Sequence, residues 1–393
     1  MPVALLALTL SAFAIGTTEF VIVGLIPTMA ADLGVSLPSA GLLVSLYALG
    51  VAVGAPVLTA LTGRWQRKTV LLSVMTLFVA GNLLAWQAPG YSALIVARLL
   101  TGLAHGVFFS IGSTVATSLV SKEKEASAIA IMFTGLTVAL VTGVPLGTYI
   151  GQMFGWQTTF LVVSGLGVVA LAGSALLIPS NLKQPAPAKI RDQLKVLTQP
   201  RLLLVYAITA LGYGGTFIAF TYLAPILEQV SGFSASLTGA ILLVYGVSVA
   251  VGNIWGGKLA DRKGPVSALT LIFSGLAAVL LALSLTAYSQ VGAVLTVLVW
   301  GAFAFGNVPG LQVYVVQLAQ KYAPNAVDVA SGLNIAAFNV GIALGAWGGG
   351  LVVAQSGLMN TPWIGALIVL LALVLTRLSG QLDRRSNAVP CPA

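Results

Sequence analysis

Long apolar runs, broken by short clusters of proline, glycine and charged residues, dominate the chain. A helix of about 20 apolar residues is long enough to cross the hydrocarbon core of a bilayer. Within lipid every main-chain polar group must find its partner inside the protein, so each run is expected to be a helix. The pattern predicts twelve spans, at 4–28, 40–62, 69–88, 92–119, 126–150, 158–178, 202–225, 236–257, 266–286, 291–319, 329–354 and 362–377.

Composition supports this all-α membrane fold class. Of the 393 residues, 58% are hydrophobic and only 7% are charged, and the mean hydropathy is +1.02. A soluble domain carries about 25% charged residues, because polar groups must cover its surface. This chain has too few of them, so we expect a lipid bilayer to surround most of its surface.

The basic residues indicate how the chain is oriented. All of the 18 except Arg98 fall in the loops that would lie on one side of the membrane if the N-terminus is cytoplasmic. An excess of lysine and arginine marks cytoplasmic loops, so we expect a multi-pass protein of the bacterial inner (plasma) membrane with both termini cytoplasmic. This pattern also explains the net charge of +9, and no nucleic-acid partner is expected.

The chain divides into two similar halves. We expect a six-helix bundle over 1–179, a cytoplasmic linker over 180–201, a second six-helix bundle over 202–378 and a cytoplasmic tail over 379–393. Gly41–Tyr47 aligns with Gly239–Tyr245 at a constant offset of 198 residues, and without a gap the alignment also pairs Arg64 with Arg262. Six spans return the chain to the same side, so the halves are predicted to be parallel repeats with a binding site between them near the bilayer midplane.

Four short motifs carry a family resemblance. The stretch Gly257-Lys-Leu-Ala-Asp261-Arg262-Lys-Gly264 resembles the G-x-L-x-D-R-x-G loop signature of the major facilitator superfamily. The corresponding first-half loop around Arg64 keeps the basic residues but lacks the aspartate. Arg98-Leu-Leu-Thr-Gly102 and Gly143-Val-Pro145-Leu-Gly147 are similar to its proton-coupled and antiporter motifs. The run Gly16-Thr-Thr-Glu19-Phe looks like the first span of the twelve-span drug:proton antiporter and sugar-efflux branch.

The resemblance implies a mechanism. Members of this branch work by alternating access through rocking of the two halves, with export of a small-molecule substrate coupled to inward flow of protons. It thereby implies sugar transport or drug resistance by efflux. Proton-coupled or passive uptake of a sugar, nucleoside or related metabolite is the alternative, and we expect a monomer.

Two charged residues lie within spans, Glu19 and Arg98, at matching depths. A charge at the bilayer centre costs about 2.5 kcal/mol or more, which makes each a functional candidate. A carboxylate that alternates between pairing with Arg98 and taking a proton would couple protonation to conformation. His105, two helical turns beyond Arg98 and able to titrate near neutral pH, is a candidate relay. The alternatives are a permanent salt bridge or an arginine that snorkels to the membrane interface, and a structural histidine.

Polar and aromatic residues deep within spans are candidate substrate contacts, because rings cover apolar solutes while amides fix hydroxyl or carbonyl groups. Helix packing is the alternative for each. The set is Tyr47, Tyr213, Phe217, Tyr245, Asn307, Asn334, Phe338 and Asn339.

The loop signature and the fifth span supply two conformational hypotheses. Gly257, Asp261, Arg262 and Gly264 are expected to form a latch that stabilises one conformation, with a solvated loop as the alternative. Gly143, Pro145 and Gly147 are expected to bend the fifth span and act as a hinge.

Other functional classes find little support. One histidine, one buried glutamate and the single cysteine, Cys391, are too few for an enzyme site, so no catalytic residue, metal or cofactor is expected. The only Gly-Lys step, Gly257-Lys258, lacks the spacing of a phosphate-binding loop, which argues against an ATP-driven pump. A non-transporting sensor stays open.

Overall fold

The computed structural model describes residues 2–58, 61–62, 65–121, 125–180, 182 and 196–388. Arg64, most of the expected linker and Cys391 lie outside these residues. The described segments contain helices and no strand. The helices are α1 (Ala4–Leu33), α2 (Leu37–Val53), η1 (Gly54–Leu58), α4 (Arg67–Trp86), α5 (Tyr91–Ser118), α6 (Glu125–Val138), η3 (Ala139–Gly143), α7 (Val144–Phe154), α8 (Trp156–Leu177), α10 (Pro200–Phe220), α11 (Leu223–Pro225), η4 (Ile226–Val230), α12 (Ala235–Lys263), α13 (Pro265–Thr286), α14 (Gln290–Tyr322), η5 (Pro324–Ala326), α15 (Val327–Ser356) and α16 (Asn360–Ala388).

The twelve predicted spans are confirmed: within the described chain, twelve helices are long and apolar enough to cross a membrane. Three spans contain a wider, π-helical turn: η1, η3 and η4. Each turn lies at a proline, namely Pro56 within η1, Pro145 just after η3 and Pro225 just before η4. Because proline has no N–H to donate to the preceding turn, the helix widens locally instead of breaking.

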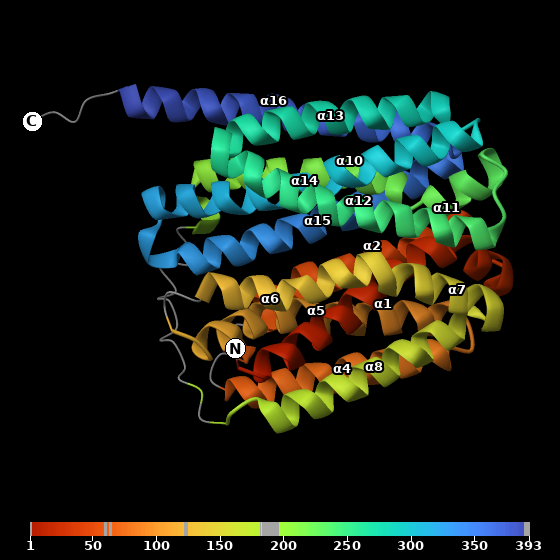
Figure 1. Cartoon of the computed structure of the whole chain (residues 1–393), viewed down its shortest axis with the longest axis horizontal. Coiled ribbons are helices and arrows are strands. Elements are labelled where there is room, and N and C mark those ends of the chain that lie inside the picture. Colours follow the sequence, from red (N-terminus) through yellow and green to blue (C-terminus); the bar gives the residue numbers. More distant parts are fainter. Residues whose placement is uncertain are drawn as a thin grey trace, which may run out of the picture.

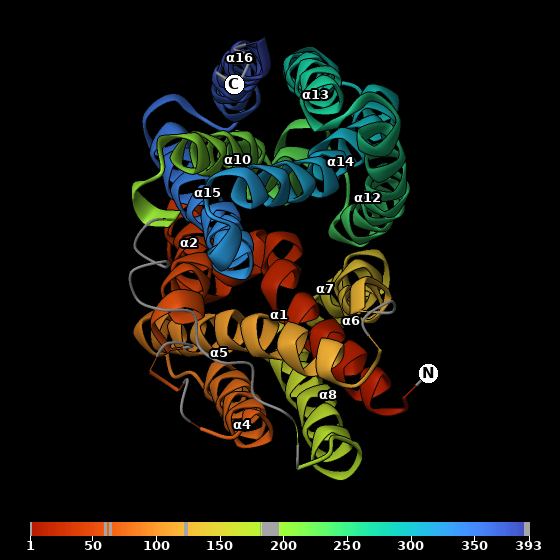
Figure 2. The same ribbon diagram turned by 90° about the vertical axis from the view of Figure 1, so that its left-hand side faces the viewer.

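The helices form two bundles (Figures 1 and 2). The first half holds α1 to α8, in which α4 packs against α5 and α8. The second half holds α10 to α16, in which α12 packs against α14 and α10 against α15 and α16. The halves meet along two seams, α2 against α15 and α12 against η3 and α7.

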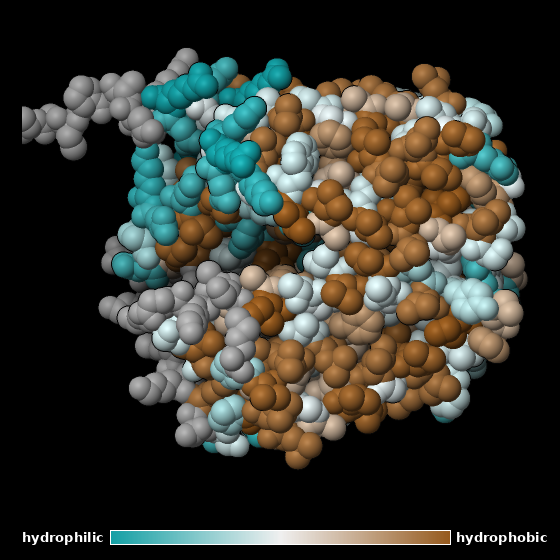
Figure 3. Space-filling model, in the orientation of Figure 1, coloured by the Kyte–Doolittle hydropathy of each residue, from teal (hydrophilic) through white to brown (hydrophobic). Residues whose placement is uncertain are grey.

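The start of α1 and the end of α16 lie at the same end of the molecule, which we call the terminal face (Figures 1 and 2). Hydrophilic side chains gather there, whereas apolar side chains cover much of the surface between the two ends (Figure 3). Helix α16 continues to Ala388, well into the segment expected to be a tail.

Close glycine contacts show that the repeat extends to the packing. A Cβ on Gly102 of α5 would overlap the carbonyl oxygen of Tyr47 on α2, and one on Gly301 of α14 would overlap that of Tyr245 on α12. Likewise, Gly54 lies against Leu103, and Gly252 against Ala302. Helix pairs α2/α5 and α12/α14 are therefore packed in the same way, with the two tyrosines at equivalent positions.

The seams are tightest toward the end opposite the terminal face. Ser45 on α2 donates a hydrogen bond of 2.5 Å to the carbonyl of Ala343 on α15. The ring of Tyr222 lies against Gly41 in the first half and Gly349 in the second. Gly246 on α12 lies directly against the main chain of Leu140 in η3. Glycine at these positions lets the backbones of the two halves approach closely.

Candidate functional site

Arg98 is buried in the first half, with only 1% of its surface exposed. Its guanidinium donates to the carbonyl oxygens of Thr18 at 2.7 Å, Leu43 at 3.3 Å and Glu19 at 3.4 Å. These acceptors belong to α1 and α2, so Arg98 on α5 joins three helices. Hydrogen bonds from a charged donor are stronger than neutral ones, and here they compensate for part of the loss of hydration.

Tyr47 lies between Arg98 and His105. The Arg98 guanidinium lies 4.0 Å from the centroid of the Tyr47 ring, a cation–π contact. The hydroxyl of the same tyrosine is 3.0 Å from Nδ1 of His105. Arg98 and His105 therefore share a helix face, as their spacing predicted. Tyr47, a predicted substrate contact, bonds within this cluster and is 1% exposed, so its contact with substrate stays a prediction.

The Glu19 carboxylate faces His105, with Oε2 at 3.8 Å from Nδ1. Both side chains are more than nine-tenths buried. The sequence favoured a pairing of Glu19 with Arg98, but the described residues show no ion pair between those side chains: Arg98 binds the main chain of Glu19. The three predicted proton-coupling residues are nevertheless brought together in one cluster.

Two residues that sequence reasoning missed hold α1 in this place. The Thr18 hydroxyl donates to Oδ1 of Asn82 on α4 at 2.7 Å, and the Asn82 amide donates to the Phe78 carbonyl at 2.8 Å. Neither residue is exposed. A lone asparagine within an apolar span was the available signal, because an amide in lipid needs partners.

Aromatic rings connect α1 to the second half. The Phe20 ring, next to Glu19 in sequence, has its centroid 6.4 Å from that of Phe217 and 6.2 Å from that of Phe305. Tyr213 stacks on Phe217 at 5.6 Å and meets Phe338 edge-on at 4.7 Å. Three predicted substrate contacts, Tyr213, Phe217 and Phe338, thus form one aromatic cluster, which Phe20 reaches from the other half.

The cluster continues to a second group of rings. Phe220 lies 5.2 Å from Phe217 and stacks on Tyr245 at 4.8 Å. Trp300 meets Tyr245 edge-on at 5.6 Å. The hydroxyl of Tyr245 and Nε1 of Trp300 are both buried and have no hydrogen-bond partner in the described chain. Phe220 and Trp300 belong to this group although sequence reasoning did not select them.

The three predicted asparagines differ in their environment. Asn334 is fully buried and satisfied: it accepts from Thr209 at 2.7 Å and donates to Gln312 at 2.9 Å. These bonds join α10, α14 and α15, so in this structure Asn334 serves helix packing. Asn307 and Asn339 each donate to a carbonyl of their own helix, whereas their side-chain oxygens are buried and accept no hydrogen bond from the described residues.

The predicted latch residues lie at the terminal end of α12. Gly264 ends this helix with φ +77°, a left-handed conformation that favours glycine. Asp261 and Arg262 are exposed and make no ion pair with another described residue. Gly257 lies beside Pro309 of α14. In this conformation the aspartate and arginine therefore join no helices together, and their latch role stays a prediction.

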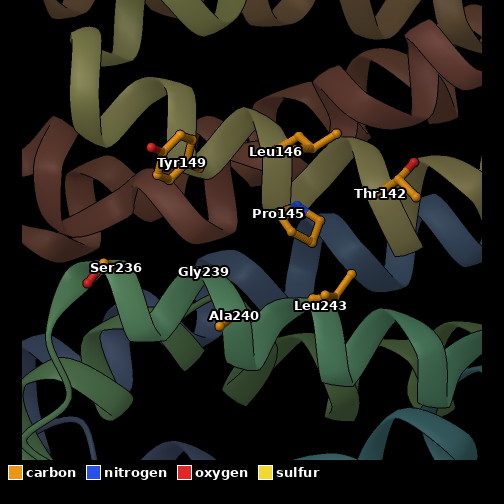
Figure 4. A pocket seen from close by; sticks show the side chains of 8 residues that line it. All are labelled: Thr142, Pro145, Leu146, Tyr149, Ser236, Gly239, Ala240 and Leu243. Atoms are coloured by element: carbon orange, nitrogen blue, oxygen red, sulfur yellow. The ribbon is translucent and has the colours of Figure 1, made fainter.

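The predicted hinge lies beside a groove between the halves (Figure 4). The groove has a volume of about 380 Å³ and is formed by η3 and α7 on one side and by α12 on the other. Pro145 contributes to its wall, together with Leu146, Tyr149 and Leu243. Gly143 and Gly147 instead pack against Thr17 and Val21 of α1. The described part of the chain brings no three His, Cys, Asp or Glu residues together as a metal site requires.

Twelve helices in two packed repeats, with an ionisable cluster beside their boundary, define a multi-pass membrane protein of the transporter class. The family model of the Major Facilitator Superfamily matches residues 8–327. The chain therefore belongs to this superfamily, as its loop motifs suggested.

Relatives match over nearly the whole chain. An uncharacterized MFS-type transporter, YtbD of Bacillus subtilis, is 54% identical, covering 98% of this chain and 97% of its own. The inner membrane transport protein YdhP of Escherichia coli is 41% identical, covering 96% of each. A chloramphenicol resistance protein of Streptomyces lividans is 32% identical, covering 95% of each. These relatives are transport and resistance proteins.

A solved structure shows the same fold. The bacterial homolog of the human lysosomal transporter Spinster, crystallised in an inward-facing and unoccupied conformation, has a TM-score of 0.78. It covers 99% of this chain and 98% of its own at 15% sequence identity. The likeness confirms the predicted two-bundle fold.

Proposed function

We propose that this protein is a secondary exporter of the bacterial inner membrane, which expels small organic solutes, sugar-like or drug-like, in exchange for protons. The observation that carries the proposal is the Glu19–His105 pair, two titratable side chains 3.8 Å apart and shielded from water. The pair adjoins Phe20, which packs on rings of the opposite half. A change in how the halves pack therefore changes the surroundings of Glu19.

Glu19 is the proton carrier in this scheme. A charge in the membrane interior costs about 2.5 kcal/mol or more, a cost that a neutral carboxylic acid avoids. When the halves separate on one side, water reaches the carboxyl group and allows it to exchange its proton. His105, within 3.8 Å, is the group to or from which that proton passes.

Arg98 and Tyr47 position the pair. The three main-chain acceptors of Arg98 keep its charge fixed on α1 and α2. Tyr47 orients the His105 ring through its hydroxyl. Because these partners all belong to the first half, the cluster moves as one body when the halves rock.

Three observations support the remaining parts of the proposal. The described basic loop residues lie at the ends of helices on the terminal face, which supports cytoplasmic termini. At the end opposite the terminal face the two halves are in close contact, and in this proposal these seams separate when access alternates. The chloramphenicol resistance protein among the relatives supports the outward direction.

The test uses inverted membrane vesicles, in which export appears as solute accumulation. A panel of labelled sugars and antibiotics is offered with and without an imposed pH gradient, acidic inside. The exporter accumulates its solute only with the gradient, and the Glu19→Gln protein does not. Accumulation that ignores the gradient contradicts proton exchange. Uptake into right-side-out cells driven by a pH gradient that is acidic outside establishes import instead.

A further inference from the structure

The two tyrosines that the repeat makes equivalent have opposite environments. The hydroxyl of Tyr47 is bonded to His105 at 3.0 Å. The hydroxyl of Tyr245 is just as deeply buried, with 2% of the residue exposed, but has no partner among the residues described. A buried polar group without a hydrogen bond is unfavourable, so its retention calls for a physical reason.

The glycine contacts explain how this difference arises. Gly102 in α5 corresponds to Gly301 in α14, because each lies against the carbonyl of its half's tyrosine. Counting on from these glycines places Ala304 where the first half has His105. The second half thus has the tyrosine but lacks the histidine that forms a hydrogen bond with its hydroxyl in the first half.

Trp300 adds a second unused donor beside the tyrosine. Its ring meets Tyr245 edge-on at 5.6 Å, it is 0% exposed, and its Nε1–H finds no acceptor in the described structure. Phe220 stacks on Tyr245 and meets Trp300 edge-on, at 4.8 and 6.1 Å between centroids. Two hydrogen-bond donors are therefore held within a frame of aromatic rings.

No formal charge belongs to this group of rings. The site's charged residues, Glu19 and Arg98, lie in the first half, and the Arg98 donors are taken by carbonyl groups. Phe217 connects this group to Phe20, the neighbour of Glu19 in sequence. Nothing in the second-half group offers a counter-charge to an anion or a cation.

We propose that Tyr245 and Trp300 form the recognition point for solute, at which an acceptor oxygen of an uncharged, ring-bearing molecule binds the tyrosine hydroxyl and the indole N–H. The proposal rests on the transport function and assigns the two tasks to different halves: the first half carries the proton and the second selects the solute. A site built to hydrogen-bond its ligand rejects analogues that lack the matching group much more strongly than an apolar pocket does.

The first test measures the purified protein without ligand. Tyr245→Phe removes an unsatisfied hydroxyl and keeps the ring stack, so its melting temperature should rise by about 1–3 °C. Tyr47→Phe is the matched control, since it removes a satisfied hydroxyl at the equivalent position, and its melting temperature should fall. A fall for Tyr245→Phe as well would show that its hydroxyl bonds within the protein or to a buried water, which overturns the proposal.

The second test compares two probes of nearly equal shape. Triphenylphosphine oxide is uncharged and presents one acceptor oxygen, whereas methyltriphenylphosphonium carries a charge and a methyl group in its place. Titration calorimetry should show the oxide binding at least tenfold more tightly. Tyr245→Phe and Trp300→Phe should each weaken binding of the oxide about tenfold and leave the cation unaffected. Preference for the cation, or binding of neither probe, contradicts the assignment.

A variant of the first half separates this proposal from the transport mechanism. Glu19→Gln should bind the oxide as the unaltered protein does, because binding is measured without a proton gradient. Loss of oxide binding in Glu19→Gln would place solute and proton in one site, against the division proposed here. Failure of proton coupling, with binding at Tyr245 intact, would refute only the exchange mechanism.

Discussion

The carboxylate of Glu19 lies 3.8 Å from Nδ1 of His105, and water has little access to either side chain. One partner belongs to α1, whose Phe20 ring reaches the second half, and the other to α5, which is fixed to α2. The pair therefore connects α1, which contacts the second half, to α5 within the first half.

Replacing Glu19 with glutamine should abolish transport driven by a pH gradient and leave solute exchange intact. Glutamine approximates a carboxyl group that is permanently neutral, so the halves still rock but carry no proton. The measurement compares gradient-driven accumulation with exchange of labelled for unlabelled solute in proteoliposomes. In the variant, accumulation should be absent at every imposed pH gradient, while exchange of labelled for unlabelled solute continues.

Glu228→Gln is the control for this change. Glu228 is another carboxylate of the long apolar helices, in η4 near the end opposite the terminal face. Its neutralisation should leave gradient-driven transport unaltered. Equal loss in both variants would mean that transport responds to any carboxyl change, and would remove the special role of Glu19.

Replacing Arg98 with lysine should destabilise the protein although the charge is kept. An ammonium group cannot reproduce the planar fork that binds three carbonyl oxygens and stacks on Tyr47. We expect the free energy of unfolding to fall by about 2–4 kcal/mol. Thermal or chemical unfolding in detergent measures this, with the exposed Arg262→Lys as the unaffected control. Unchanged stability would show that the charge alone holds α1, α2 and α5 together.

A valine at Gly246 should open the seam between the halves at the end opposite the terminal face. Any Cβ there overlaps the main chain of Leu140, so η3 and α12 must move apart. Ser45→Cys at the other seam, in a Cys391→Ser background, reports the opening through its reaction with an impermeant maleimide. Labelling should become severalfold faster.

Gly239→Ala on the same helix is the matched control for the seam. A Cβ at this position meets only Thr148, at an ordinary contact distance of 3.9 Å. Its labelling rate should match that of the unaltered seam. Slow labelling of the Gly246 variant would show that the halves tolerate bulk at this contact and close elsewhere.

Replacing Asp383 with alanine should loosen the terminal end of the second half. Its carboxylate bonds to Arg201 on α10 and accepts from the Tyr314 hydroxyl on α14 at 2.7 Å. Loss of these partly buried bonds should lower the free energy of unfolding by about 1–3 kcal/mol. Leu382→Ala, an exposed neighbour on α16, should change it little. Similar loss in both variants would assign the effect to the helix and not to the network.

The architecture could be predicted from the sequence because every span in lipid must pair its main-chain polar groups internally and therefore forms a helix. The apolar runs, the basic loops and the repeat led to twelve helices in two halves, and the structure confirms the helices and their packing symmetry. Glu19 and Arg98 were found because a charge in an apolar run stands out. Helical spacing grouped His105 with Arg98, and matching depth in the membrane grouped Glu19 with Arg98.

The sequence could not show which groups pair with Arg98 and with the aromatic rings of the site. Arg98 binds main-chain carbonyl oxygens, which every residue possesses, so no side-chain pattern distinguishes them from an acidic partner. Phe20 and Trp300 are ordinary members of apolar runs until folding brings their rings to the others. Asn334 is the opposite case, because the sequence marked it as a polar residue deep in a span. In the structure its side chain is hydrogen-bonded to Thr209 and Gln312.

Ala304 opposite Tyr245 has a consequence for how such proteins diversify. The two bundles share one backbone contact geometry, and the division of tasks proposed above would need only one different side chain beside an equivalent tyrosine. On the proposed division of tasks, changes around Tyr245 should alter which solute binds without affecting the Glu19–His105 pair. Related proteins with this arrangement could then change their solute by substitutions in the second half and keep the same proton-coupling residues.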